Sequence, residues 1–215
     1  MGRAKDYIEN SKNELSSLLY NINGAIVEIA PFIEEETLNQ RKYYTRLNSV
    51  KDLLKYLEDM LHKESKDGLF GFLNDSSRIE KVKEKENEYY MHINQLKNCS
   101  KCKCLNCIKS CNLDSCRGCR EGSFVKECNK ENFNTVFHND FILNLSRDGG
   151  ESLRYKVLAT MQNIESDKRY IIIEEIINGE KFILYYYPGI SESDFGEITN
   201  EDEFNFIVNT FEKLR

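Results

Sequence analysis

The sequence predicts an α+β protein with a helical N-terminal part, a cysteine-rich centre and an antiparallel sheet closed by a helix. Three observations predict this fold class. Apolar residues recur at three- and four-residue steps through the first part, all eight cysteines lie between Cys99 and Cys128, and β-branched and aromatic runs follow them. We therefore divide the chain into a helical, coiled-coil-like bundle (1–98), a zinc-binding module (99–130) and a sheet domain (131–215).

Two long helices are expected at the start of the bundle. From Lys5 to about Ile33, isoleucine and leucine residues mark one helix face, and Pro31 indicates a kink or the boundary to the next segment. From Tyr43 to Leu61 the apolar steps alternate between four and three, as in a coiled coil, so this helix is expected to pack antiparallel against the first. Such a stripe is an internal seam or an oligomer interface, which leaves the oligomeric state open.

A third helix is expected to open at Ser77, with Glu80 in capping-box spacing, and to run to Leu96. Glu86 occupies a seam position, which weakens its register. The apolar loop 67–74 comes before this helix. It folds back over the end of the bundle as part of the core, or it is a docking plug for a partner.

Two β-hairpins are expected after the cysteines. Asp148-Gly149-Gly150 and Asn178-Gly179 are their turns, and the Asn-Gly pair suits the positive φ angles of a type I′ turn. A closing helix, capped by Thr199 or Asn200, presents an apolar face that can cover one side of the sheet. The expected strands span residues 141–145, 153–158, 170–177 and 181–187, with a short fifth strand near 196–198.

This order of elements resembles a known family. The Tyr-rich strand 181–187, the acidic linker 191–197 and the closing stretch 198–211 are similar to the small bacterial YrzB-type domain of unassigned function. The resemblance covers about the last 80 residues and implies a small β domain without catalytic machinery. It carries over no site residues, and the helical part and the cysteines depart from it.

The cysteines have the spacing of a metal-binding module, C-x2-C-x-C-x2-C-x3-C-x4-C-x2-C-x8-C. In a reducing cytoplasm, clustered thiols are better explained as ligands than as disulfides. Eight thiolates form two four-thiolate sites without remainder, so two structural zinc ions are expected. The predicted ligands are Cys99, Cys102, Cys104, Cys107, Cys111, Cys116, Cys119 and Cys128.

How these ligands are shared between the ions is less well defined by the spacing. Only one residue separates Cys102 from Cys104, so the C-x2-C pairs on either side of it are expected to serve different ions. One ion is then expected to draw its remaining ligands from Cys116 and Cys119, and the other from Cys111 and Cys128. A thiolate that bridges two neighbouring ions is also open, because Cys102-Lys103-Cys104 has the C-x-C spacing of metallothionein-like clusters.

An iron–sulfur cluster is one alternative to zinc. Cys104, Cys107 and Cys111 follow part of a ferredoxin run, but the spacing before them is one residue short and no proline follows the last cysteine. Redox-switch or storage thiols are another alternative. Among the histidines, His92 could replace a cysteine because it lies about two helical turns before Cys99, although an ordinary role fits it better. His62 and His138 have no ligand-spaced partner and are read as structural.

The cysteine segment is basic in an acidic chain. From Lys97 to Lys130 there are eight basic and three acidic residues, a balance of +5, which leaves −11 for the rest of a chain with net charge −6. Each four-thiolate zinc site carries −2, so two sites bring the segment to about +1. Taken without the metal, the positive charge indicates a nucleic-acid-binding patch. In that alternative, the residues that contact phosphate are Lys101, Lys103, Lys109, Arg117, Arg120 and Lys126.

No catalytic motif stands out. The chain has no H-E-x-x-H, no phosphate-binding loop and no G-x-S-x-G, so an enzyme is not favoured. We expect a non-catalytic, zinc-binding protein-interaction or regulatory factor with protein partners. A nucleic-acid-associated zinc protein and an iron–sulfur protein are the alternatives. The first residues contain neither a secretory signal nor a membrane span, which favours a cytoplasmic location.

Overall fold

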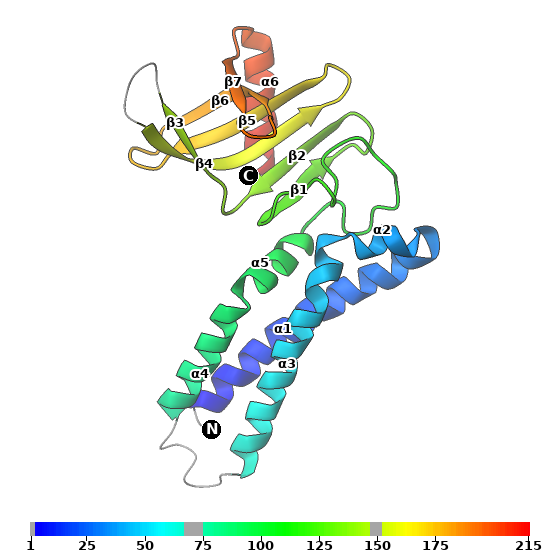
Figure 1. The fold of residues 1–215 in the computed structure, drawn as a ribbon, viewed down its shortest axis with the longest axis vertical. Coiled ribbons are helices and arrows are strands. Elements are labelled where there is room, and N and C mark those ends of the chain that lie inside the picture. Colours follow the sequence, from blue (N-terminus) through cyan, green and yellow to red (C-terminus); the bar gives the residue numbers. More distant parts are fainter. Residues whose placement is uncertain (1–2, 67–74, 147–151) are drawn as a thin grey trace. The chain divides into compact units, whose positions relative to one another are not determined.

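A computed structural model describes residues 3–66, 75–146 and 152–215 of the chain (Figure 1). The predicted loop 67–74 and the Asp148-Gly149-Gly150 turn lie outside the described residues. Contacts divide the chain into two compact units, Met1–Ser100 and Lys101–Arg215, and each unit is described by itself. In the described parts of the chain, no helix is both long and apolar enough to cross a membrane.

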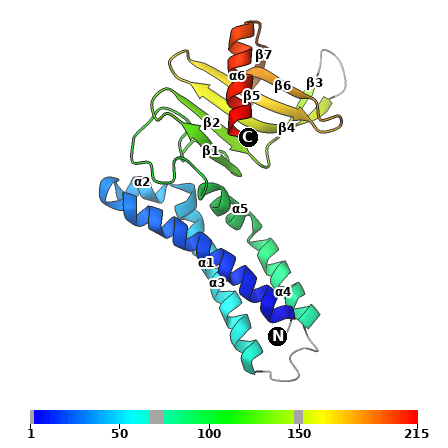
Figure 2. The ribbon, with the colours of Figure 1, turned by 180° about the vertical axis from the view of Figure 1, so that it is seen from behind.

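The first unit is helical. Figures 1 and 2 show α1 and α3 side by side and running in opposite directions. An ion pair of 3.4 Å joins Lys12, early in α1, to Glu58, late in α3, which confirms the antiparallel arrangement. Its elements are α1 (Arg3–Ile29), a 3-10 turn η1 (Ala30–Phe32), α2 (Glu35–Asn39), α3 (Lys42–Lys66), α4 (Asp75–Glu88) and α5 (Tyr90–Cys99).

The apolar seam of α1 and α3 forms the core of this unit. Ile8 and Ile22 of α1 are fully buried, as the helical period predicts. In α3 Leu53 is fully buried, like Val50 and Leu57 on the same stripe, whereas its neighbour Leu54 is half-buried. Leu53 lies three residues and Leu54 four residues after Val50, so either could continue the helical stripe. In the folded unit it is Leu53 that packs into the core. Pro31 lies in the 3-10 turn that ends α1, so it marks a boundary.

The third predicted helix is two helices, α4 and α5, with a break at Tyr89. The capping-box prediction is wrong, because α4 begins at Asp75 and Ser77 lies inside its first turn. The Tyr7 hydroxyl donates a 2.7 Å hydrogen bond to Glu86, which explains an acidic residue in the seam. Burial, followed by this bond and the Glu86 charge, raises the pKa of Tyr7 to about 12.

The second unit is an antiparallel sheet of seven strands in the order β1-β2-β4-β5-β6-β7, with β3 also paired to β4. The prediction of four or five strands missed the first two, at 123–128 and 133–138. In both, polar or cysteine residues interrupt the apolar alternation that identifies a strand. The strands are β1 (Ser123–Cys128), β2 (Phe133–His138), β3 (Ile142–Ser146), β4 (Ser152–Asn163), β5 (Lys168–Glu175), β6 (Lys181–Tyr187) and β7 (Asp194–Glu197).

The hairpin of β5 and β6 confirms a turn at Asn178-Gly179, but the turn is not type I′. Gly179 has a φ of +73°, whereas Asn178 has no positive φ. The Glu175 N–H donates to the Glu180 carbonyl over 2.8 Å, which closes a longer loop than a two-residue turn would. The Asn178 side chain accepts the Glu180 N–H instead, also at 2.8 Å.

Helix α6 (Glu201–Leu214) covers one face of the sheet, as predicted (Figure 2). Asn200 is its cap, with its side chain accepting the Glu203 N–H over 2.9 Å. Ile207 and Phe211 pack on the sheet residues Met161 and Ile172. A second apolar cluster on other sheet residues contains Phe141, Tyr155, Val157, Ile171 and Ile173.

Candidate metal centre

The first part of the cysteine-rich segment in the sheet unit, around residues 102–104, pairs with the edge strand β1. Backbone hydrogen bonds of 3.0 and 3.2 Å close two overlapping turns, 102–105 and 104–107. The Lys103 N–H donates to the Val125 carbonyl over 2.9 Å, so the first turn pairs with the middle of β1. The strand β1, which was not predicted from the sequence, therefore positions Cys102 and Cys104.

Backbone amides point at two of the sulfur atoms. The sulfur of Cys102 accepts the N–H groups of Val125 (3.3 Å) and Cys104 (3.4 Å). The sulfur of Cys128 accepts the N–H of Lys130 over 3.1 Å. Amide donors stabilise the negative charge of a thiolate, and such bonds orient the ligands around a bound metal. Thiolate sulfur is one of the ligand types that bind zinc in proteins.

Two ion pairs bring further cysteine segments to the end of β1. Lys103 lies 3.6 Å from Glu127, which directly precedes Cys128. Lys109, midway between the fourth and fifth cysteines, lies 3.7 Å from Glu131 in the loop after β1. Each pair is exposed and contributes little stability by itself. Their value here is positional, because they join the cysteines of both segments to one strand end.

The thiols in this region also affect each other electrostatically. A hydrogen bond with Cys102, then burial, then the charges of Cys102, Cys107 and Cys128 raise the pKa of Cys104. Burial raises the pKa of Cys128, and the charges of Cys111 and Cys107 act in the same direction. A bound cation reverses this effect, because a coordinated thiol loses its proton.

The loop around Asp114 is anchored on the sheet by three contacts. Its backbone N–H donates to the Gln162 side chain over 2.7 Å, and its carbonyl accepts from the Asn134 side chain over 3.2 Å. Its carboxylate lies 3.7 Å from Arg169. Leu113 beside it is buried. This loop is therefore fixed to β2, β4 and β5.

The other predicted ligands have different surroundings. Cys119 is buried, and its N–H donates to the Ser115 carbonyl over 2.8 Å, so a turn places it after the anchored loop together with Cys116. Cys99 belongs to the first unit as the last residue of α5. It is buried, and its sulfur accepts from the Gln95 side chain over 3.3 Å.

Zinc ligation by these cysteines stays a prediction. All eight are among the described residues, and none forms a disulfide. In the described part of the chain, no group of three or more Cys, His, Asp or Glu side chains is placed so that it could hold a metal ion. The thiols are instead hydrogen-bonded to one another and to the backbone.

The histidines lie outside this cluster. Both ring nitrogens of His138 are hydrogen-bonded, to the hydroxyls of Ser123 (2.6 Å) and Thr160 (2.9 Å), inside the sheet unit. This is the structural role expected from the sequence. Burial, with the nearby Arg120 charge, lowers the pKa of His138 to about 4. His92 lies on α5, and its Nδ1 atom is buried without a hydrogen-bond partner among the described residues.

Most of the basic residues in this segment are engaged within the unit. Lys103 and Lys109 form the ion pairs given above. Arg117 is exposed, on the loop of Cys116 and Cys119. The others lie over aromatic rings: Lys101 over Phe124 (5.8 Å to the ring centre), Arg120 over Phe141 (3.8 Å) and Lys126 over Phe137 (5.9 Å).

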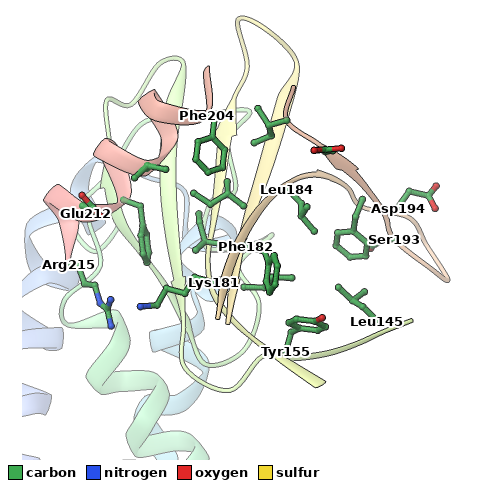
Figure 3. Close-up of a pocket in the computed structure, with 18 of the residues that line it drawn as sticks. Leu145, Tyr155, Lys181, Phe182, Leu184, Ser193, Asp194, Phe204, Glu212 and Arg215 are labelled. Atoms are coloured by element: carbon green, nitrogen blue, oxygen red, sulfur yellow. The ribbon is translucent and has the colours of Figure 1, made fainter. Parts of the chain in front are cut away.

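A separate cavity of about 1060 Å³ lies in the sheet unit, away from the cysteines (Figure 3). Phe204 and Val208 of α6 line it together with Phe182, Leu184 and Phe195 of the last two strands. Its lining residues, all among those described, include neither cysteine nor histidine. Lys181 at its border forms a 3.6 Å ion pair with Glu174. Sequence patterns missed this cavity because its walls come from distant segments.

Comparisons with models of known families, with curated proteins and with solved structures found no match for this chain. The resemblance of the C-terminal part to YrzB-type domains stays a prediction. The function is therefore argued from the residues themselves.

Proposed function

We propose that this protein is a non-catalytic zinc-binding factor. Structural zinc fixes the cysteine segment on the sheet unit, and the surfaces of the folded protein bind protein partners. The observation that carries the proposal is the gathering of cysteines along β1, where backbone amides donate to the sulfur of Cys102 near the middle of the strand and to the sulfur of Cys128 at its end. Closed sets of four thiolates, without an open position, are typical of structural zinc.

The cysteine segment has too little apolar surface to hold its own fold. Between Lys101 and Gly122 the buried apolar side chains are those of Leu113 and Cys119, whereas Ile108 is half exposed. Zinc binding contributes about 10–16 kcal/mol apparent per structural site in small zinc domains. That contribution would replace the missing core of this segment.

The cavity beside α6 supports the interaction part of the proposal. Several apolar side chains around the second apolar cluster of the sheet are only partly buried. They are Leu143, Leu145, Phe182, Leu184 and Phe195. Adjoining apolar side chains that stay accessible to solvent are typical of surfaces that bind other molecules. We place the partner-binding surface at this cavity and the partly buried side chains beside it, rather than on the cysteine segment.

The decisive experiment is metal analysis of the full chain, produced with both zinc and iron in the medium. We expect a colourless protein with about two zinc ions per chain, as eight thiolates predict. A brown protein that contains iron and sulfide would support the iron–sulfur alternative instead. A protein that binds neither metal, although its sheet unit is folded by circular dichroism, would refute the proposal. A sample stripped with a chelator under reducing conditions is the control.

The nucleic-acid alternative makes a different prediction. If it were correct, the chain would bind labelled DNA or RNA at low salt, and binding would fall steeply as salt increases. Replacing Lys101, Lys103 and Arg117 with alanine would weaken it. Lys101 lies over the Phe124 ring and Lys103 is paired with Glu127, and these contacts do not favour this function. We expect no binding at low salt.

A further inference from the structure

We propose that one zinc ion lies at the C-terminal end of β1 and is held by Cys104, Cys107, Cys111 and Cys128. This inference rests on the proposed zinc function and names the ligands of one site. The spacing separates Cys111 and Cys128 from the Cys116/Cys119 pair, but it does not say which C-x2-C pair joins them. The contacts of the described residues decide this point.

The first step concerns Cys104 and Cys128. The residues immediately before them, Lys103 and Glu127, are joined by the 3.6 Å ion pair. Neighbouring Cα atoms are 3.8 Å apart, so this pair brings the two cysteines to the same end of the strand. The turn that closes between the Cys107 N–H and the Cys104 carbonyl (3.2 Å) then adds Cys107.

The second step concerns Cys111. Lys109 lies two residues after Cys107 and two residues before Cys111, and it is 3.7 Å from Glu131. Two residues of chain span at most about 7 Å, so both cysteines have Cα atoms within about 7 Å of the Lys109 Cα. The segment 107–111 therefore lies beside the loop that follows Cys128.

The third step concerns the loop after Cys128, which already has a fixed shape. The Asn129 side chain accepts three backbone N–H groups at 2.8–3.0 Å, from Glu131, Asn132 and Phe133. Lys130 has a φ of +67°, and its N–H donates to the Cys128 sulfur over 3.1 Å. This arrangement orients the sulfur before any metal binds, as hydrogen bonds to metal ligands commonly do.

Cys102 is the nearest rival for this site. Its sulfur accepts the Val125 N–H over 3.3 Å, three residues before Cys128 on the same strand. Three residues of strand span about 10 Å, so the amide that holds the Cys102 sulfur lies toward the middle of β1. The Cys102 thiol is also hydrogen-bonded to Cys104. We assign Cys102 to the other ion, together with Cys116 and Cys119, because only one residue separates it from Cys104.

Cadmium-113 NMR of the full chain tests this assignment, with ¹¹³Cd in place of zinc. We expect two signals from four-thiolate sites. Cys111→Ser and Cys128→Ser should shift or remove the same signal, and the matched variants Cys102→Ser and Cys116→Ser should change the other one. The assignment is wrong if Cys111→Ser and Cys128→Ser affect different signals, or if Cys102→Ser alters the signal that depends on Cys128.

A second measurement uses the unmodified protein, in case a serine variant does not fold. The zinc-loaded chain is titrated with a chelator, and the newly reactive thiols are alkylated and located by mass spectrometry. Cys104, Cys107, Cys111 and Cys128 should become reactive in one step, separate from Cys116 and Cys119. Release of Cys111 together with Cys116 and Cys119 would overturn the inference. A chain that binds no zinc or cadmium would refute the proposed function itself, whereas two ions with another grouping would refute the ligand set alone.

Discussion

The side-chain oxygen of Gln162 accepts a 2.7 Å hydrogen bond from the backbone N–H of Asp114. Gln162 faces Asn134 across the pairing of β4 with β2, and the Asn134 side chain donates to the carbonyl of the same aspartate over 3.2 Å. Two neighbouring strands thus hold the peptide groups on both sides of one loop residue. This clamp attaches the cysteine-rich segment to the sheet independently of any metal.

Loss of the clamp is expected to destabilise the sheet unit. Gln162→Ala leaves the Asp114 N–H without its partner in a partly buried site, which costs about 1–2 kcal/mol of unfolding free energy. Urea denaturation measures the loss, and hydrogen exchange should become faster at residues 113–119. The matched control is Asn144→Ala, an exposed amide on β3, with an expected change within about 0.5 kcal/mol. Equal effects of the two variants would contradict the clamp.

Removal of zinc is expected to unfold the cysteine segment while the helical core stays intact. The buried residues of α1 and α3 include no cysteine, so their amides should keep the same exchange rates. Residues 102–112, which lie between α5 and the anchored loop, lose a contribution of about 10–16 kcal/mol apparent per ion, and their amides should exchange at rates near those of an unfolded chain. Hydrogen exchange with mass spectrometry, with and without chelator, measures both regions. Complete metal loss without faster exchange in 102–112 would count against a structural role.

His138 is expected to make stability depend on pH. Burial first, and the Arg120 charge second, lower its pKa to about 4 in the folded protein, against about 6.5 in an unfolded chain. Because the folded pKa is the lower one, the contribution is complete above pH 6.5 and is lost as pH falls toward 4. At pH 4.5 the loss is about 2–3 kcal/mol of unfolding free energy relative to neutral pH.

Urea denaturation at pH 7.5 and 4.5 measures this dependence. His138→Gln keeps a hydrogen-bonding side chain that does not titrate, so the difference between the two pH values should shrink by that amount. Asn144→Ala, at an exposed position on β3 that does not titrate, is the control and should leave the difference unchanged. An unaltered pH dependence in His138→Gln would show that other groups cause it.

Tyr170 is expected to secure α6 on the sheet. Its hydroxyl donates a 2.6 Å hydrogen bond to Glu203 in the first turn of the helix, and Lys168 pairs with the same carboxylate at 2.6 Å. Tyr170→Phe removes one donor and should lower the unfolding free energy by about 1–2 kcal/mol, since the acceptor is charged but partly exposed. Tyr187→Phe is the matched control at an exposed position of β6, with an expected change within about 0.5 kcal/mol. Similar values for both variants would refute a role of this bond.

Much of the architecture follows from local patterns in the sequence. The stripe from Ile8 to Ile29 identified α1, and Pro31 located its end. The last helix, its Asn200 cap and its cover over the sheet also agree with the prediction. These features depend on residues a few positions apart, so the period of the apolar side chains is enough to find them.

Two strands escaped prediction for a physical reason. In β2, Asn134 and Thr135 are buried, and the Asn134 side chain bonds to the distant Asp114. In β1 the alternation is broken by an irregularity between Val125 and Glu127 and by the cysteine at its end. A buried polar residue looks like a surface residue in a sequence, because its partner lies far away along the chain.

The cysteine segment shows the same division. By itself the sequence identified the cysteines as candidate metal ligands, because thiol identity and spacing are local chemical properties. Only the tertiary structure decided where these residues lie, since the positions of Cys104, Cys107 and Cys111 beside Cys128 depend on pairing with β1 and on the ion pairs Lys103–Glu127 and Lys109–Glu131. Those contacts form when distant segments fold onto one sheet edge, so the periodicity of apolar residues cannot predict them.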